Sequence, residues 1–155
     1  MPAGAFVFFA RNLADLRLND LPSATVKIAL LSSSYTPSAG EAGHHVWSDV
    51  SGNEIANGNG YSSGGITLSS TNVTSRTNGW KFSSANPQWS SSGSGIPAWR
   101  YAVMYVSGTL WGKSSPLIGY FLGDAAPADV ALTPSGGTLT LTMPAADGWF
   151  DITRG

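Results

Sequence analysis

The segment Trp99-Arg100-Tyr101-Ala102-Val103-Met104-Tyr105-Val106 decides the fold. Its residues are apolar or aromatic at almost every position, which is typical of a central strand that is covered on both faces of its sheet. The next apolar run is Pro116-Leu117-Ile118-Gly119-Tyr120-Phe121-Leu122. Because consecutive strands usually lie side by side, we expect this second run to be the neighbour of the first.

Segments on both sides of this pair also have strand patterns. In residues 25–31, Val26, Ile28 and Leu30 share one face of the predicted strand. The other predicted strands are residues 65–68, 72–74, 80–82, 138–143 and 149–152. Turns rich in Gly, Pro and Ser separate these strands, and Asn78-Gly79 predicts a hairpin turn. The pattern predicts an all-β fold, an antiparallel β-sandwich of jelly-roll or Ig-like type.

A helical pattern occurs near the N-terminus. Large apolar side chains in residues 5–18 recur at steps of three and four, at Phe6, Phe9, Leu13 and Leu16. We therefore expect a short amphipathic helix that ends before Pro22. Residues 1–155 are predicted to form a single domain, and its helical segment 1–20 is predicted to pack on that domain or on a neighbouring subunit.

Residues 32–65 form a long polar stretch that is predicted to be an ordered loop. Its few apolar side chains would anchor it to the domain: Tyr35, Val46, Trp47, Val50, Ile55 and Tyr61.

Composition excludes several classes of function. The 155 residues carry a net charge of −1, so no excess positive charge favours binding to nucleic acid. The chain has no cysteine, which excludes disulfides, thiol catalysis and cysteine-ligated zinc. Arg11 interrupts the apolar start well short of a membrane span, so we expect neither a membrane segment nor a cleaved leader.

Gly60-Tyr61-Ser62-Ser63-Gly64 matches the G-x-S-x-G pattern of a nucleophile elbow. That elbow needs a buried strand before the serine and a helix after it. Here Asn57-Gly58-Asn59 precedes the motif and the strand-like Ile66-Thr67-Leu68 follows it. We therefore interpret the motif as a loop and nominate no catalytic residue, although a hydrolase using Ser62 is kept as a hypothesis.

Metal-ligand residue types gather only around His44-His45, with Glu41 and Asp49 nearby. Adjacent residues of an extended segment point in opposite directions, so the two rings are poorly placed to share one ion. Residues 49–54 offer oxygen ligands but lack the alternating acidic pattern of an EF-hand. We predict a polar loop or a subunit contact, with no metal and no cofactor.

The order of these segments resembles a group of small structural proteins of tailed-bacteriophage virions. The likeness extends from about residue 6 to residue 152 and is carried by residues 9–13, 26–37, 47–55, 60–68, 99–105 and 115–120. It implies a non-enzymatic capsid decoration (cement, minor capsid) protein on the exterior of the virion, assembled in the cytoplasm of the bacterial host.

The resemblance also implies partners: the major capsid protein and other copies of this chain, in a trimer. Exposed aromatic residues would then be contact hot spots. The candidates are Trp47, Tyr61, Trp80, Trp89 and Trp111, and burial of each within its own domain is the alternative. A second hypothesis is a tail- or fibre-associated binding module that recognises host glycan, because aromatic rings beside polar loops fit it equally well.

Overall fold

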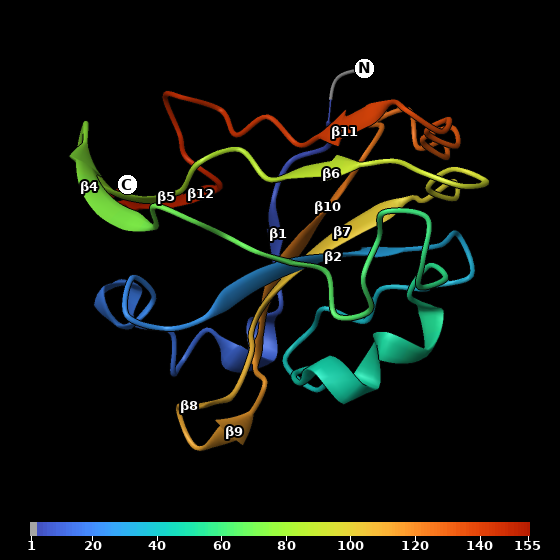
Figure 1. The fold of residues 1–155 in the computed structure, drawn as a ribbon. Coiled ribbons are helices and arrows are strands. Elements are labelled where there is room, and N and C mark those ends of the chain that lie inside the picture. The colour runs from blue at the N-terminus through green and yellow to red at the C-terminus, as the bar shows by residue number, and fades with distance from the viewer. Residues whose placement is uncertain (1–2) are drawn as a thin grey trace.

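The computed structural model describes residues 3–155, and Figure 1 shows an arrangement of short strands. The strands are β1 (Val7–Phe8), β2 (Val26–Leu31), β3 (Ile66–Thr67), β4 (Asn72–Arg76), β5 (Gly79–Ser83), β6 (Gln88–Ser90), β7 (Tyr101–Val106), β8 (Thr109–Leu110), β9 (Lys113–Ser114), β10 (Leu117–Leu122), β11 (Thr138–Thr140) and β12 (Phe150–Thr153). Within residues 3–155 the helical segments are 3-10 turns of three residues: η1 (Ala10–Asn12), η2 (Leu18–Asp20), η3 (Trp47–Asp49) and η4 (Ser51–Asn53). The all-β prediction is confirmed.

The largest sheet has five antiparallel strands in the order β1-β10-β7-β2-β3. Strand β7, the core of the segment quoted first, lies at its centre and pairs with β2 on one side and with β10 on the other. The predicted pairing of the two apolar runs is therefore confirmed. Leu117 and Gly119 flank an irregularity in the β7–β10 register.

The central strand is buried on both faces of this sheet, as the continuous apolar pattern predicts. Met104 belongs to one buried cluster, which also contains Phe82 of β5 and Trp149, the residue before β12. Val103 points the opposite way and belongs to a second buried cluster, with Val50 of the long loop. An alternating polar face would have exposed half of this strand to water.

Two small antiparallel sheets lie against the first cluster. They are β12-β5-β4 and the pair β11-β6, at the left and the top of Figure 1. The predicted hairpin joins β4 to β5, but its two loop residues are Thr77 and Asn78, because Arg76 pairs with Gly79. Asn78 has a φ of 61°, a conformation that asparagine tolerates better than most residues.

The predicted helix over residues 5–18 is wrong. Val7–Phe8 forms edge strand β1 beside β10 instead. The rings of Phe6 and Phe8, two residues apart, both reach the Phe150 ring, with centroid separations of 4.9 and 5.1 Å. Asn12 then buries its side chain and donates to the carbonyl oxygens of His45 and Leu117. Pairing with a sheet edge and these distant partners override a weak local preference for helix.

The long loop contributes to the buried clusters on both faces of the central sheet. Of the anchors predicted for residues 32–65, the side chains of Tyr35 and Val50 are buried in the second cluster, and those of Ile55 and Tyr61 are buried in the first. Near its end the loop returns to β2, where the Ile55 amide donates to the Leu30 carbonyl at 3.0 Å. In the part of the chain described, no helix has the length and apolar character needed to cross a membrane.

Candidate contact surface

The five aromatic candidates lie in different environments. Tyr61 and Trp89 are 1% and 5% exposed and fill the first buried cluster, so they offer almost no surface to a partner. Trp47 and Trp111 are half-buried. Trp80 is 55% exposed, and among residues 3–155 it has the largest exposed fraction of the large apolar side chains.

Trp47 and Trp111 both make specific contacts inside the chain. The Trp47 ring stacks on Tyr105 with a centroid separation of 4.3 Å and an angle of 8° between the planes. Trp111 lies at the tip of the β8–β9 hairpin, and its indole nitrogen donates to the Asp20 carboxylate at 2.9 Å. Each of these rings therefore fixes a peripheral segment of its own domain.

The strand register explains the exposure of Trp80. In sheet β12-β5-β4, Trp80 lies opposite Ile152 on one side and Ser75 on the other, and residues two apart share a face. Phe82 shares that face with Trp80 and is completely buried. One end of the face therefore packs into the core, while the other end extends beyond it and leaves Ile152 46% exposed beside Trp80.

A shallow hollow adjoins the exposed indole. Its volume is about 170 Å³, and its wall consists of Arg17, Leu18, Asn19, Val73 and Trp80. Leu18 belongs to η2 and packs against the first cluster from the side. We refer to Arg17, Leu18, Trp80, Ile152 and Arg154 as the Trp80 patch. Sequence reasoning identified only Trp80 of this set, because the other four residues reach it through the tertiary fold.

A larger cavity of about 620 Å³ lies between the N-terminal segment and β12. Phe6, Phe8 and Phe121 are among its apolar lining residues. Arg76 also lines it and forms ion pairs with Asp147 and Asp151. These pairs were not predicted, because the aspartates read as isolated turn residues in the sequence. The Arg76 guanidinium balances one of the two carboxylates, so the group keeps one net negative charge at the cavity wall.

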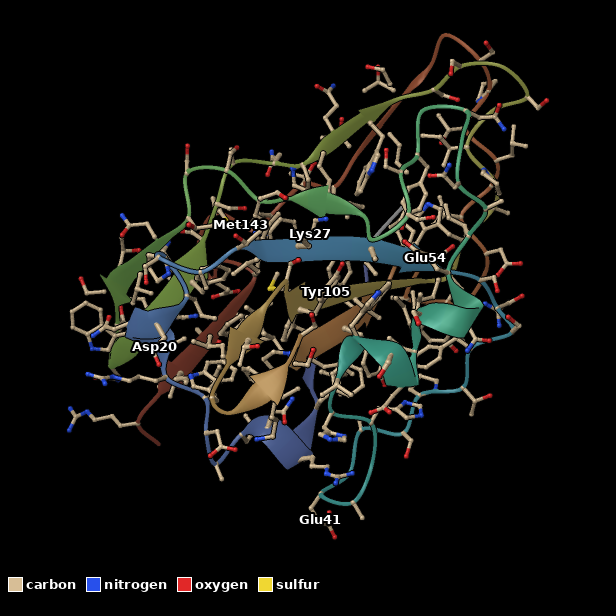
Figure 2. All side chains as sticks on the ribbon, turned by 60° about the horizontal axis from the view of Figure 1, so that its bottom comes forward. Asp20, Lys27, Glu41, Glu54, Tyr105 and Met143 are labelled. Atoms are coloured by element: carbon tan, nitrogen blue, oxygen red, sulfur yellow. The ribbon has the colours of Figure 1, made fainter. Side chains whose placement is uncertain are left out.

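A hydrogen-bonded network connects the long loop to the central sheet. Glu54 accepts hydrogen bonds from the Tyr61 hydroxyl at 2.7 Å and from the Gly64 amide at 2.6 Å. The Tyr105 hydroxyl donates to the Gly64 carbonyl at 2.6 Å, and the Tyr61 hydroxyl accepts from the Leu30 amide at 3.0 Å. Figure 2 labels Tyr105 on β7 and Glu54 in the loop. The network fixes residues 54–64 in place over β2 and β7.

Burial is the main influence on the tyrosines of this network. It raises the pKa of Tyr105 to about 12, with a smaller contribution from the negative charge of Glu54. Burial and the hydrogen bond to Glu54 also raise the pKa of Tyr61. Both hydroxyls therefore stay protonated at neutral pH, as their hydrogen-bond donor roles require.

Ser62 lies in a turn, where its carbonyl accepts the Gly65 amide at 2.9 Å and strand β3 follows. This is the loop that the sequence context predicts, and it differs from the strand–turn–helix geometry of a nucleophile elbow. The His44 ring bonds the Tyr35 hydroxyl at 3.0 Å, and the His45 ring nitrogen lies 3.1 Å from an Asp49 oxygen. Both histidines thus have structural partners within the loop.

Asp49 acts mainly as a cap for the turn that contains it. Its carboxylate accepts the backbone amides of His45 and Val46. Burial on its own would raise the pKa of Asp49, but these two hydrogen bonds and the nearby histidines outweigh it and hold the pKa below its usual value. Across residues 3–155, no three His, Asp or Glu side chains gather closely enough to hold a metal ion.

Comparison with known proteins found no matching family model, no similar curated protein and no similar solved structure.

Proposed function

We propose that this chain is a non-enzymatic structural protein of a phage particle, a decoration protein that binds the exterior of the head and stabilises the shell. The observation that carries the proposal is the pair Trp80 and Ile152, large apolar side chains held 55% and 46% exposed on a β-sheet. Rigid strands present the pair at no further cost in backbone ordering, and exposed tryptophan is a common anchor of protein interfaces.

The segment order of the sequence, which resembles small virion proteins, supports the same proposal. We propose further that the five-stranded sheet and the smaller sheets opposite it form a β-sandwich of jelly-roll or Ig-like type. The shared buried cluster of Met104, Phe82 and Trp149 supports this finer assignment. Added contact area across the junctions between shell subunits would be the source of stabilisation, and a trimer of this chain would multiply it.

Labelling the protein in intact particles tests its location. Many copies distributed over the head are expected, whereas a few copies at the tail would contradict decoration and favour the glycan-binding module. Heads that lack the protein should release their DNA at a lower temperature than complete heads. Unchanged release after clean removal would contradict a stabilising role.

A further inference from the structure

We propose that the Trp80 patch binds an acidic protein segment that carries a large apolar side chain. This inference rests on the proposed function, because it specifies the chemistry of the shell segment to which the chain would attach. The apolar side chain would enter the hollow between Leu18 and the indole, and carboxylates on either side of it would meet Arg17 and Arg154.

The geometry brings one cation to the indole and a second to the sheet face that the indole shares with Ile152. Arg17 lines the hollow together with Trp80 and with Val73 of β4. Arg154 follows β12, on the other side of β5, and its amide donates to the Asn78 carbonyl at 2.9 Å, so the antiparallel pairing continues. Residues two apart share a face, which places Arg154 on the same face as Ile152.

Neither of these two guanidinium groups is paired with a carboxylate of residues 3–155, and the one hydrogen bond of the Arg154 guanidinium is a long one, 3.4 Å to the side-chain oxygen of Asn78. Among residues 3–155 the ion pairs of the basic side chains involve Arg76, Arg100, Lys113 and His45, and neither Arg17 nor Arg154 takes part in one. Both arginines are exposed. The patch therefore contains two positive charges and no negative charge, on a chain whose net charge is −1.

The carboxylates on neighbouring elements already have partners. Asp20 of η2 accepts the Trp111 indole, and Asp15 pairs with Lys113. Asp147 and Asp151 pair with Arg76. The Trp111 indole is neutral, so Asp20 keeps its negative charge, but neither Arg17 nor Arg154 forms an ion pair with any of these four carboxylates. An apolar centre with a cation on each side is complementary to an apolar side chain between carboxylates.

Binding of synthetic peptides to the full chain tests the chemistry directly. The probes are a peptide of Glu and Leu, matched peptides of Lys and Leu and of Ser and Leu, and an oligo-dT strand. Nuclear magnetic resonance would follow the indole N–H signals, with Trp80 assigned from the W80F variant. We expect the Glu/Leu peptide to shift the Trp80 signal at the lowest concentration, and rising NaCl to weaken its binding.

Charge reversal separates this patch from general electrostatics. Arg17→Glu combined with Arg154→Glu should weaken binding of the Glu/Leu peptide by at least about fivefold. Arg11→Glu is the matched control, because Arg11 is also exposed but contacts the Gly43 carbonyl, and it should change binding little. Equal binding of the Ser/Leu peptide, tighter binding of oligo-dT, or absence of binding by every probe would overturn the inference.

Heads purified without the protein distinguish this inference from the proposed function. If the unaltered chain binds such heads and the doubly reversed variant binds them equally well, the inference fails and decoration stands. If the acidic peptide binds but the heads do not, decoration fails and the chemistry of the patch stands. Circular dichroism of each variant confirms that it is folded, so that a loss of binding is not a loss of structure.

Discussion

At the scale of single residues, the hydroxyl groups of Tyr61 and Tyr105 stabilise the fold through hydrogen bonds, in addition to the packing of their rings. Tyr61 is 1% exposed, and its hydroxyl both accepts the Leu30 amide and donates to Glu54. A buried amide without an acceptor is costly because water cannot replace the lost partner. The hydroxyl thus links the loop, through Glu54, to a central strand.

Tyr61→Phe should lower the free energy of unfolding by about 1–3 kcal/mol, because it leaves the Leu30 amide and Glu54 without this partner. Urea unfolding followed by fluorescence measures the change. Tyr101→Phe is the matched control: Tyr101 is half-buried, and its hydroxyl makes no hydrogen bond to residues 3–155. Equal losses in the two variants would contradict the role assigned to the Tyr61 hydroxyl.

The raised pKa of Tyr105 predicts a loss of stability at alkaline pH. Its pKa is about 12 in the folded chain, compared with 10.0 for an unperturbed tyrosine. Its contribution to stability is complete below the lower value and is lost as the pH rises through the folded pKa, because the unfolded chain loses the proton first. The free energy of unfolding, measured with urea at increasing pH, should fall less steeply for Tyr105→Phe than for the unaltered chain. Identical slopes would show that this hydroxyl does not couple folding to pH.

At the scale of elements, close approach of backbones determines where the short strands lie. Gly65 immediately precedes β3 and has a φ of 79°. A Cβ atom at this position would lie 2.0 Å from the Ile28 carbonyl oxygen of β2. Strand β3 can therefore reach the edge of the central sheet only because residue 65 has no side chain.

Gly65→Ala should destabilise the chain by at least about 2 kcal/mol, through left-handed strain and the clash with β2. Gly52→Ala is the control: Gly52 lies in η4 of the same loop, and its Cβ would meet no atom within 4 Å. Thermal and urea unfolding of both variants measure the difference. If Gly65→Ala is as stable as Gly52→Ala, then the close approach of β3 to β2 does not restrict residue 65.

At the scale of the whole molecule, the tryptophans separate into those that hold the fold together and one that faces solvent. Trp99 is 2% exposed and lies in the core, whereas Trp80 is 55% exposed at the end of its sheet. Deleting a buried aromatic ring leaves a cavity, but deleting an exposed one removes few contacts. Substitution of Trp99 therefore tests the packing of the core, and substitution of Trp80 tests association with a partner.

Trp99→Ala should cost about 3–5 kcal/mol of stability, and Trp80→Ala less than about 0.5 kcal/mol. The proposed decoration role predicts that Trp80→Ala nevertheless abolishes attachment to heads, as measured by cosedimentation with particles that lack the protein. A strongly destabilised Trp80→Ala variant would mean that this ring supports the fold. A stable variant that still attaches fully would show that the contact surface does not depend on Trp80.

Continuous or alternating apolar patterns allowed much of the framework to be predicted from sequence. The central strand, its β10 neighbour and the β2 strand were found because hydrophobic burial acts on local runs of residues. The N-terminal segment was wrongly predicted to be a helix, because the spacing of Phe6 and Phe9 fits a helix as well as an extended edge strand. Only contacts with Phe150 and pairing with β10 decide between the two.

The proposed contact surface also separates what the sequence determines from what the tertiary structure determines. The amino-acid sequence by itself determined that the chain is all-β, that it lacks thiol chemistry and that it is rich in tryptophan. Only the tertiary structure decided which aromatic rings are covered, and it brought Arg17 into the wall of the hollow beside Trp80 and continued β12 to Arg154 beside Asn78. The physical reason is that strand patterns depend on neighbours in sequence, whereas exposure depends on what the rest of the chain places on top of a side chain.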